Sequence, residues 1–350
     1  MREYMDQEKL TVVRERKGFI AALDQSGGST GKTLEKYGIP KDSYSTEDEM
    51  FELIHEMRKR VFTSPVFTNE KILGSILFYK TMESEVDGEY TADYLWKKKN
   101  IVSFLKVDKG LADEANNVKV MKDIPDLEEQ LSVARSRHVF GTKMRSVILG
   151  ANREGIKEIV KQQFAFAKTI CDNGLVPIIE PEVDINIPDK DKAEMILKEE
   201  IKMVLNSWNP EDLIMFKFTI PSEANLYEEL YDYNCVIRIL ALSGGYEMEK
   251  ACELLRKNTH MIASFSRALL ENLYAYQSDE EFDNYEPQGG VFYDLDTLEK
   301  ALNFTLISEG WLRNNQTYGD AVTLRVRLHS LIVGNNAKYF DVKEYISLEQ

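Results

Sequence analysis

Short apolar runs alternate with longer amphipathic segments along most of the chain, and this alternation constrains the fold more than any other feature of the sequence. Eight apolar runs are bounded by turn or charged residues: GFIAAL, ILGSILF, IVSFLKV, MRSVILG, LVPIIEP, LIMFKFT, CVIRILAL and MIASF. The segments between them have helical spacing, as in STEDEMFELIHEMRKRV, where Thr46 and Glu49 predict a capping box at the helix start. Eight such alternations predict an α/β fold of the TIM (β/α)8 barrel type.

Composition and charge restrict the partners of the chain. With 350 residues and 43% hydrophobic content, it can bury a large core. Its formal net charge of −15 argues against a nucleic-acid partner and against an anionic membrane, since both require a basic surface. The stretch MREYMDQEKLTVVRERKG is charged throughout and no apolar run reaches membrane-spanning length, so we expect a cytoplasmic protein.

The cysteines and histidines do not follow a known metal or disulfide pattern. Cys171, Cys235 and Cys252 lack CxxC spacing, which favours buried, reduced thiols. The four histidines lie far apart in sequence, and none belongs to an H-E-x-x-H pair. Folding can bring distant histidines together, but the sequence favours chemistry without a metal.

Polar side chains occur inside or at the end of most of the apolar runs, and they are the candidate functional residues. Because barrel strands are buried on both faces, the lysine inside LIMFKFT must reach the barrel mouth or be paired with an opposite charge. Active sites of such barrels lie at the carboxyl ends of the strands. Structural ion pairs around the rim are the alternative interpretation. The residues concerned are Asp24, Lys106, Asp108, Lys143, Arg145, Glu180, Glu182, Lys217, Ser243, Gly244, Ser264 and Arg267.

The stretch GFIAALDQSGGSTGKT resembles a phosphate-binding P-loop, G-x-x-x-x-G-K-[ST], in which Ser26 replaces the first glycine. A P-loop delivers phosphate to the N-terminus of a long helix, but only LEKY follows here before Gly38 and Pro40. A carboxylate at Asp24, just after the strand, would also repel a triphosphate. A P-loop nucleotide enzyme is therefore the least favoured interpretation.

Seven segments, in chain order, resemble the class I fructose-bisphosphate aldolases, particularly the shorter bacterial type: FIAALDQSGGST, FLKVDKG, FGTKMRS, VPIIEPEV, MFKFTIP, ILALSGG and IASFSRAL. The resemblance implies reversible cleavage of fructose 1,6-bisphosphate to dihydroxyacetone phosphate and glyceraldehyde 3-phosphate, in glycolysis and gluconeogenesis, without a cofactor or metal. The substrate it implies is a small sugar phosphate. Alternatives are another ketose bisphosphate, such as tagatose 1,6-bisphosphate, and a non-catalytic sugar-phosphate-binding scaffold.

The resemblance also implies roles for the charged residues in the strands. Lys217 corresponds to the amine that forms a Schiff base with the ketose. Only a neutral amine attacks a carbonyl, and burial and a nearby cation both favour the neutral form; Lys143 corresponds to that cation, with Arg145 in the same positive wall. Glu180 resembles the general acid and base that dehydrates the carbinolamine. Glu182 resembles a neighbour that balances charge, and strand alternation suggests that the two carboxylates do different work.

Further residues correspond to substrate contacts. Asp24 resembles the barrel-centre carboxylate that contacts the substrate hydroxyls and helps to arrange proton transfer as the carbon–carbon bond breaks. The remaining residues resemble hydroxyl and phosphate contacts at the two ends of the open-chain sugar: Ser26 and Ser29 at one end, Ser243, Gly244, Ser264 and Arg267 at the other, with Lys106 at the distant phosphate.

Three positions depart from the animal enzymes of this family. Gln25 replaces an acidic residue after Asp24, which makes that part of the rim less negative. Ser266 stands where the animal enzymes carry glycine. The chain ends in KEYISLEQ, without the terminal tyrosine of the animal enzymes, and the position of Tyr345 does not assign it that role.

The C-terminal segment falls outside the resemblance. We expect the barrel domain to span residues 1–283 and a small α+β appendage of unknown role to span residues 284–350. Within the appendage, TLEKALNFTLISE has helical spacing and VTLRVRLHSLIV alternates apolar with polar residues, as in a half-buried strand. With KYFDVKEYISL after the turn at Gly334, Asn335 and Asn336, this strand can form a hairpin. An exposed hairpin edge can pair with another chain, so we expect a homo-oligomer.

Overall fold

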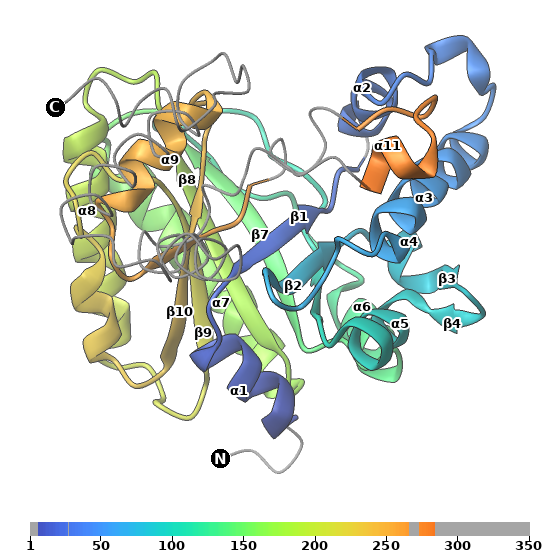
Figure 1. The fold of residues 1–350 in the computed structure, drawn as a ribbon. Coiled ribbons are helices and arrows are strands. Elements are labelled where there is room, and N and C mark those ends of the chain that lie inside the picture. The colour runs from blue at the N-terminus through green and yellow to red at the C-terminus, as the bar shows by residue number, and fades with distance from the viewer. Residues whose placement is uncertain (1–5, 27, 266–272, 284–350) are drawn as a thin grey trace, which may run out of the picture. The chain divides into compact units, whose positions relative to one another are not determined.

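The computed structural model describes residues 6–26, 28–265 and 273–283, all within the first of two compact units, residues 1–294. Eight parallel strands form its sheet, in the order in which they occur along the chain, and the last lies beside the first, so that the sheet is nearly closed into a barrel (Figure 1). They are β1 (Phe19–Leu23), β2 (Ile72–Leu77), β5 (Val102–Lys106), β7 (Gly141–Ile148), β8 (Val176–Val183), β9 (Ile214–Thr219), β10 (Val236–Leu242) and β11 (Met261–Ala263).

The eight strands coincide with the eight apolar runs, so the predicted (β/α)8 architecture is confirmed. Both faces of these strands are buried, one by the barrel interior and the other by helices, which is why the runs are apolar without alternation. Eight helices connect them: α2 (Gly28–Lys36), α3 (Glu47–Thr63), α4 (Tyr79–Glu83), α5 (Thr91–Lys99), α6 (Leu127–Ser136), α7 (Arg153–Asp172), α8 (Lys190–Leu205) and α9 (Met248–Arg256).

Shorter elements complete the described part of the chain. A hairpin of β3 (Glu85–Val86) and β4 (Glu89–Tyr90) lies between α4 and α5, β6 (Val118–Lys119) pairs antiparallel with β7, and α11 (Asp279–Asp283) ends the described segment. The predicted capping box is present at the start of α3. The side-chain oxygen of Thr46 accepts the backbone N–H of Glu49, and the side chain of Glu49 accepts the backbone N–H of Thr46. No helix among the described residues is long and apolar enough to cross a membrane. The predicted appendage, 284–350, lies outside the described residues.

One aromatic side chain, that of Phe104, fills part of the barrel interior. Phe104 is fully buried there, between strands that carry Gly74 and Gly141. A Cβ atom at Gly141 would lie 2.8 Å from the Phe104 ring and 2.2 Å from the carbonyl oxygen of Val176, and one at Gly74 would lie 3.0 Å from the same ring. Both glycines therefore leave the space that the ring occupies.

A helix that the sequence reasoning did not predict closes the amino-terminal end of the barrel. It is α1 (Gln7–Glu15), drawn in dark blue in Figure 1 at the end where the strands begin. Its Leu10 and Val13 belong to the same buried cluster as the inward-facing Ile20 and Val102. The apolar side of α1 thus covers the bottom of the barrel interior.

Hydrogen bonds to distant parts of the chain fix α1 in this position. Lys9 Nζ donates to the carbonyl oxygen of His138, just before β7, at 2.7 Å. From β10, Arg238 Nε donates to the carbonyl oxygen of Val13 at 2.8 Å, and its Nη2 donates to that of Arg16 at 3.2 Å. The two bonds from Arg238 satisfy carbonyl groups at the end of α1 that the helix itself leaves free.

We expect Val13→Ala to lower the free energy of unfolding by about 2 kcal/mol, because it removes two buried methyl groups and leaves a cavity. Thr11→Ala is the matched control: Thr11 is exposed on the same helix and its loss should change stability by less than about 0.5 kcal/mol. Urea denaturation measures both. Equal effects of the two changes would show that α1 is not packed against the barrel.

Candidate active site

The carboxyl ends of the strands bring the predicted catalytic residues together. Asp24 directly follows β1, Lys143 lies in β7, Glu180 in β8 and Lys217 in β9. The register of the sheet adds a fifth charge beside them, because Lys106 at the end of β5 lies opposite Lys143 in β7. Each of these charges stands in an otherwise apolar run, so the strands hold them at the barrel mouth.

A continuous series of ion pairs joins four of these side chains. Lys217 Nζ lies 3.2 Å from Glu180 Oε1, and Glu180 Oε2 lies 2.8 Å from Lys143 Nζ. Lys143 Nζ also donates to Asp24 Oδ2 at 3.0 Å. The two lysine side chains are each 5% exposed, that of Glu180 4% and that of Asp24 12%. Two amines and two carboxylates therefore alternate in a nearly water-free space.

This arrangement lowers the pKa of Asp24 and raises the pKa of Lys143. Burial alone would raise the pKa of Asp24, but the positive charges of Lys143, Lys217 and Lys106 hold that pKa below its usual range. Burial alone would lower the pKa of Lys143, but the carboxylates of Asp24, Glu180 and Asp108 hold it above its usual range. At neutral pH Asp24 is therefore an anion and Lys143 a cation.

A cavity of about 310 Å³ opens beside this series. Arg145 lies at its wall, and its Nε donates to Glu182 Oε2 at 2.6 Å; burial would lower the pKa of Arg145, but this carboxylate raises it. Lys106 Nζ is 2.9 Å from Asp108 Oδ1. The lining residues are Asp24, Gln25, Ser26, Lys106, Asp108, Gly110, Leu111, Lys143 and Arg145. Five of the residues that were assigned a role from the sequence thus line one cavity, together with Asp108.

Glu180 and Glu182 do not point to opposite faces of β8. They lie two residues apart on one strand, so their side chains project to the same face, and the expected separation by alternation was wrong. The two carboxylates differ instead in their ion-pair partners and in their exposure. Glu180 is buried between the two lysines, whereas Glu182 is 14% exposed and pairs with Arg145 near the mouth.

The structure describes only some of the residues that were expected to bind the phosphate at the other end of the sugar. Gly244 adopts a φ of 60°, and a Cβ there would lie 2.9 Å from Ile185 after β8 and 3.1 Å from Thr219 in β9, so the turn that begins at Ser243 crosses above neighbouring strands. Ser264 is buried after β11, and its Oγ has no hydrogen-bond partner among the described residues. Arg267 and the side chain of Ser29 lie outside what the structure describes.

The structure disfavours the P-loop interpretation. Helix α2 begins at Gly28, so Gly31, Lys32 and Thr33 already lie within it. In a P-loop the residues before the glycine that corresponds to Gly31 form a loop whose free N–H groups bind phosphate, whereas here residues 28–30 already belong to the nine-residue helix, in which Lys32 is exposed.

Asp108 was among the candidate residues named from the sequence, but it was assigned no role in the site. It is 8% exposed and lines the cavity; its Oδ1 accepts the backbone N–H of Gly110 at 3.2 Å and pairs with Lys106. Its Oδ2 is buried without a hydrogen-bond partner in the described part of the chain. The available signal was its spacing: Asp108 follows Lys106 by two residues at the end of an apolar run.

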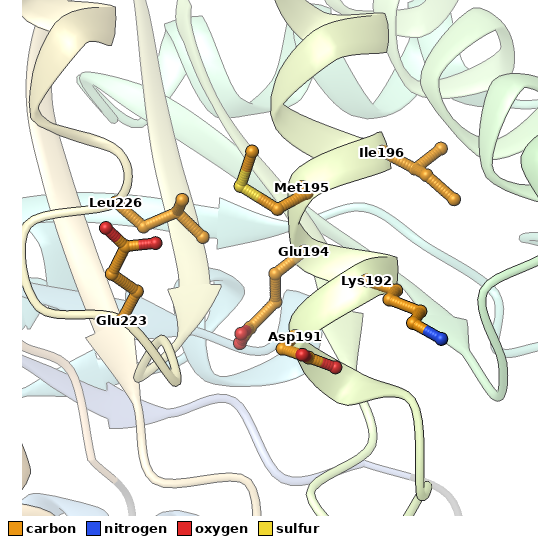
Figure 2. A pocket seen from close by; sticks show the side chains of 7 residues that line it. All are labelled: Asp191, Lys192, Glu194, Met195, Ile196, Glu223 and Leu226. Atoms are coloured by element: carbon orange, nitrogen blue, oxygen red, sulfur yellow. The ribbon is translucent and has the colours of Figure 1, made fainter.

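A second hollow, of about 390 Å³, lies away from this site between α8 and the segment after β9 (Figure 2). Three of its lining side chains are the carboxylates of Asp191, Glu194 and Glu223, which would repel an anionic substrate. Glu194 is already paired with the buried Lys190, which donates to the carbonyl oxygen of Ile220 at 2.9 Å. This hollow is therefore not suited to a sugar phosphate.

Comparison with known proteins identifies the family. The sequence model of the family described as "Glycolytic: Fructose-bisphosphate aldolase class-I" matches residues 5–215. The chain belongs to this family. The resemblance inferred from the seven sequence motifs is thereby confirmed, and the family supports lyase activity of the aldolase type through a lysine Schiff base. The matched range ends just before Lys217, so the role of this lysine rests on the local motif and on the geometry above.

One solved structure supports the fold of this class I aldolase. The fructose-bisphosphate aldolase of Plasmodium falciparum, determined as a ternary complex with TRAP and a small-molecule inhibitor, is 18% identical, with a TM-score of 0.62 over 83% of this chain and 94% of that chain. Cgl0159 of Corynebacterium glutamicum is 12% identical, over 76% of this chain and 86% of that chain, with a TM-score of 0.43, too low to carry an argument.

The low pKa of Asp24 predicts a specific pH dependence of stability. A carboxyl whose pKa is lower in the folded than in the unfolded state stabilises the fold above its usual pKa of 3.8, and this contribution is lost as pH falls. Between pH 5 and pH 3 we expect the wild type to lose about 1 kcal/mol more unfolding free energy than Asp24→Asn. Glu52→Gln, which removes an exposed carboxylate from α3, should behave as the wild type. Parallel pH profiles for Asp24→Asn and the wild type would contradict the assignment.

Proposed function

We propose that this protein cleaves fructose 1,6-bisphosphate reversibly to dihydroxyacetone phosphate and glyceraldehyde 3-phosphate through a Schiff base on Lys217, in glycolysis and gluconeogenesis. The observation that carries the proposal is the buried series Lys217, Glu180, Lys143 and Asp24. It places an amine beside a carboxylate that can exchange protons with it. A second amine, held protonated, stands on the other side of that carboxylate.

Imine formation requires a nucleophile and a proton carrier. Lys217 Nζ attacks the ketose carbonyl carbon, and the carbinolamine then loses its hydroxyl group as water. Glu180, 3.2 Å from Lys217, is placed to accept the ammonium proton and to deliver a proton to the departing hydroxyl. Lys143 is less suited to the attack because its raised pKa keeps it protonated at neutral pH.

Cleavage of the carbon–carbon bond uses the protonated imine as the electron sink. The C4 hydroxyl loses its proton, the C3–C4 bond breaks, and the electron pair moves toward the imine nitrogen to give an enamine while the aldehyde departs. Asp24 is an anion at neutral pH and lines the cavity, where it can orient the hydroxyl groups of the substrate and assist this proton transfer. Protonation of the enamine and hydrolysis release dihydroxyacetone phosphate.

The phosphate groups of the substrate are bound by side chains at the mouth of the cavity. Ser26, Lys106 and Arg145 line the cavity and offer a hydroxyl, an ammonium and a guanidinium to one end of the open-chain sugar. We assign the other end to the turn at Ser243 and Gly244, with Ser264 and Arg267. The epimer tagatose 1,6-bisphosphate would use the same groups, so the ratio of kcat/KM for the two substrates decides between them.

The roles of the two lysines can be separated by trapping with borohydride, which reduces an imine to a stable adduct. With dihydroxyacetone phosphate, the wild type should gain the mass of the reduced adduct on Lys217, and Lys217→Met should gain none. Lys143→Met should still be trapped, but on the order of a hundredfold more slowly, because a positioned cation is lost. Peptide mass spectrometry locates the adduct.

The control for this experiment is Lys109→Met, which removes an exposed lysine near the cavity and should leave trapping unchanged. An adduct that persists in Lys217→Met would overturn the assignment. Absence of any adduct in the wild type would instead favour a sugar-phosphate-binding scaffold.

A strong chelator should leave the aldolase activity intact, because the protonated imine on Lys217 supplies the electrophile that a metal would otherwise provide. The cleavage rate is measured before and after dialysis against the chelator. Activity that disappears on dialysis and returns with zinc would contradict a Schiff-base mechanism. We further propose a cytoplasmic homo-oligomer, which light scattering at several protein concentrations tests.

A further inference from the structure

One buried cation among the described residues has no carboxylate partner. The buried lysine and arginine side chains in that part of the chain are Lys9, Arg58, Lys143, Lys190 and Lys217. Each of the four lysines forms an ion pair with an aspartate or glutamate. Arg58, which is 0% exposed, forms none within the described ranges. An unpaired buried charge is costly, so its position calls for a physical reason.

Arg58 lies on α3 and binds the loop that follows β1. Its Nη2 donates to the carbonyl oxygen of Gln25 at 2.6 Å and to Gln25 Oε1 at 3.3 Å. Its Nη1 donates to Thr81 Oγ1, in α4 after β2, at 2.7 Å, and its Nε is buried without a described partner. Gln25 Nε2 in turn donates to the carbonyl oxygen of Ala22. The guanidinium therefore fixes the main chain between two cavity-lining residues, Asp24 and Ser26.

The cations that line the cavity are already neutralised by neighbours. Lys106 pairs with Asp108, and Arg145 pairs with Glu182. Lys143 pairs with both Asp24 and Glu180. Such pairs largely cancel at a distance, so an incoming phosphate experiences little net attraction from them. The charge of Arg58 is not cancelled in this way.

Arg58 remains charged under working conditions. Burial lowers its pKa to about 10, against the opposing effect of the negative charge of Asp24, and this value still lies well above neutral pH. Its partners in hydrogen bonds are a carbonyl, an amide and a hydroxyl oxygen, none of which carries a negative charge.

We propose that Arg58 is a positioning residue for a phosphate group of the substrate: it fixes the loop at Gln25 and supplies uncompensated positive charge behind the cavity. The neutral side chain of Gln25 is part of this device. A glutamate of the same size would pair with Arg58 and cancel its charge. The inference rests on the proposed function, since it assumes that the cavity binds the phosphate monoester of a sugar.

The decisive variant is Gln25→Glu, which preserves the size of the side chain and the oxygen that accepts from Arg58, gives up the donation to the carbonyl oxygen of Ala22, and neutralises Arg58. We expect the dissociation constant for inorganic phosphate, measured by calorimetry, to rise roughly tenfold, as expected for one added charge within about 10 Å of a dianion in salt. KM for the bisphosphate should rise similarly, with a much smaller change in kcat. Gln7→Glu adds the same charge on exposed α1, at the opposite end of the barrel, and should have no effect.

A second pair of variants separates charge from shape. Arg58→Lys retains the charge and should bind phosphate within about threefold of the wild type, whereas Arg58→Met should match the weakened binding of Gln25→Glu. Circular dichroism and urea denaturation confirm that each variant is folded. If Arg58→Met does not fold, Gln25→Glu and Arg58→Lys decide alone.

Unchanged phosphate affinity in folded Gln25→Glu would overturn the proposal. So would equal phosphate affinity in Arg58→Lys and Arg58→Met, or a loss of kcat in Gln25→Glu without weaker phosphate binding. Failure of the proposed function is distinguishable from these outcomes, because it appears in the wild type as the absence of a borohydride adduct and of cleavage. The calorimetric comparison with inorganic phosphate does not depend on turnover.

Discussion

The ion pairs that join Lys217, Glu180, Lys143 and Asp24 keep four charged side chains inside a barrel, where a single unpaired charge would be costly. Each charge is tolerated because its neighbour has the opposite sign and because three different strands and one strand end hold the groups in contact. The barrel therefore does more than present residues at a rim. Its closure and register set the order of signs, and that order places the carboxylate of Glu180 between two amines, of which Lys143 is fixed as a cation.

The same order explains how a strongly acidic chain can accept an anionic substrate. The net charge of −15 is distributed over the whole molecule, and the second hollow, with its three carboxylates, reflects it. The cavity at the carboxyl ends is different because its carboxylates are matched by cations. Local arrangement, rather than overall composition, thus determines where a phosphate can approach.

Much of the fold was predictable from sequence because parallel barrel strands are buried on both faces and appear as continuous apolar runs. Lys217 and Glu180 were predictable for the same reason, since a charge inside such a run is conspicuous. Arg58 was not, because charged residues are expected in an amphipathic helix. Its position four residues after Ile54 and three before Val61 nevertheless places it on the buried stripe of α3. Helix α1 escaped prediction because its few apolar residues stand among charges, and the strands that it contacts most, β2, β5 and β10, lie farther along the chain.

The contact between α1 and Arg238 has a consequence for the synthesis of the protein. Val13 and Arg238 are separated by 225 positions in the chain, so their hydrogen bond cannot form until about two thirds of the polypeptide has been made. During translation the first helix emerges long before the strands that it covers are complete. The apolar side of α1 therefore stays exposed while the rest of the chain is being made. The charged residues around it, which also obscured the helix in the sequence, help to keep this segment in solution.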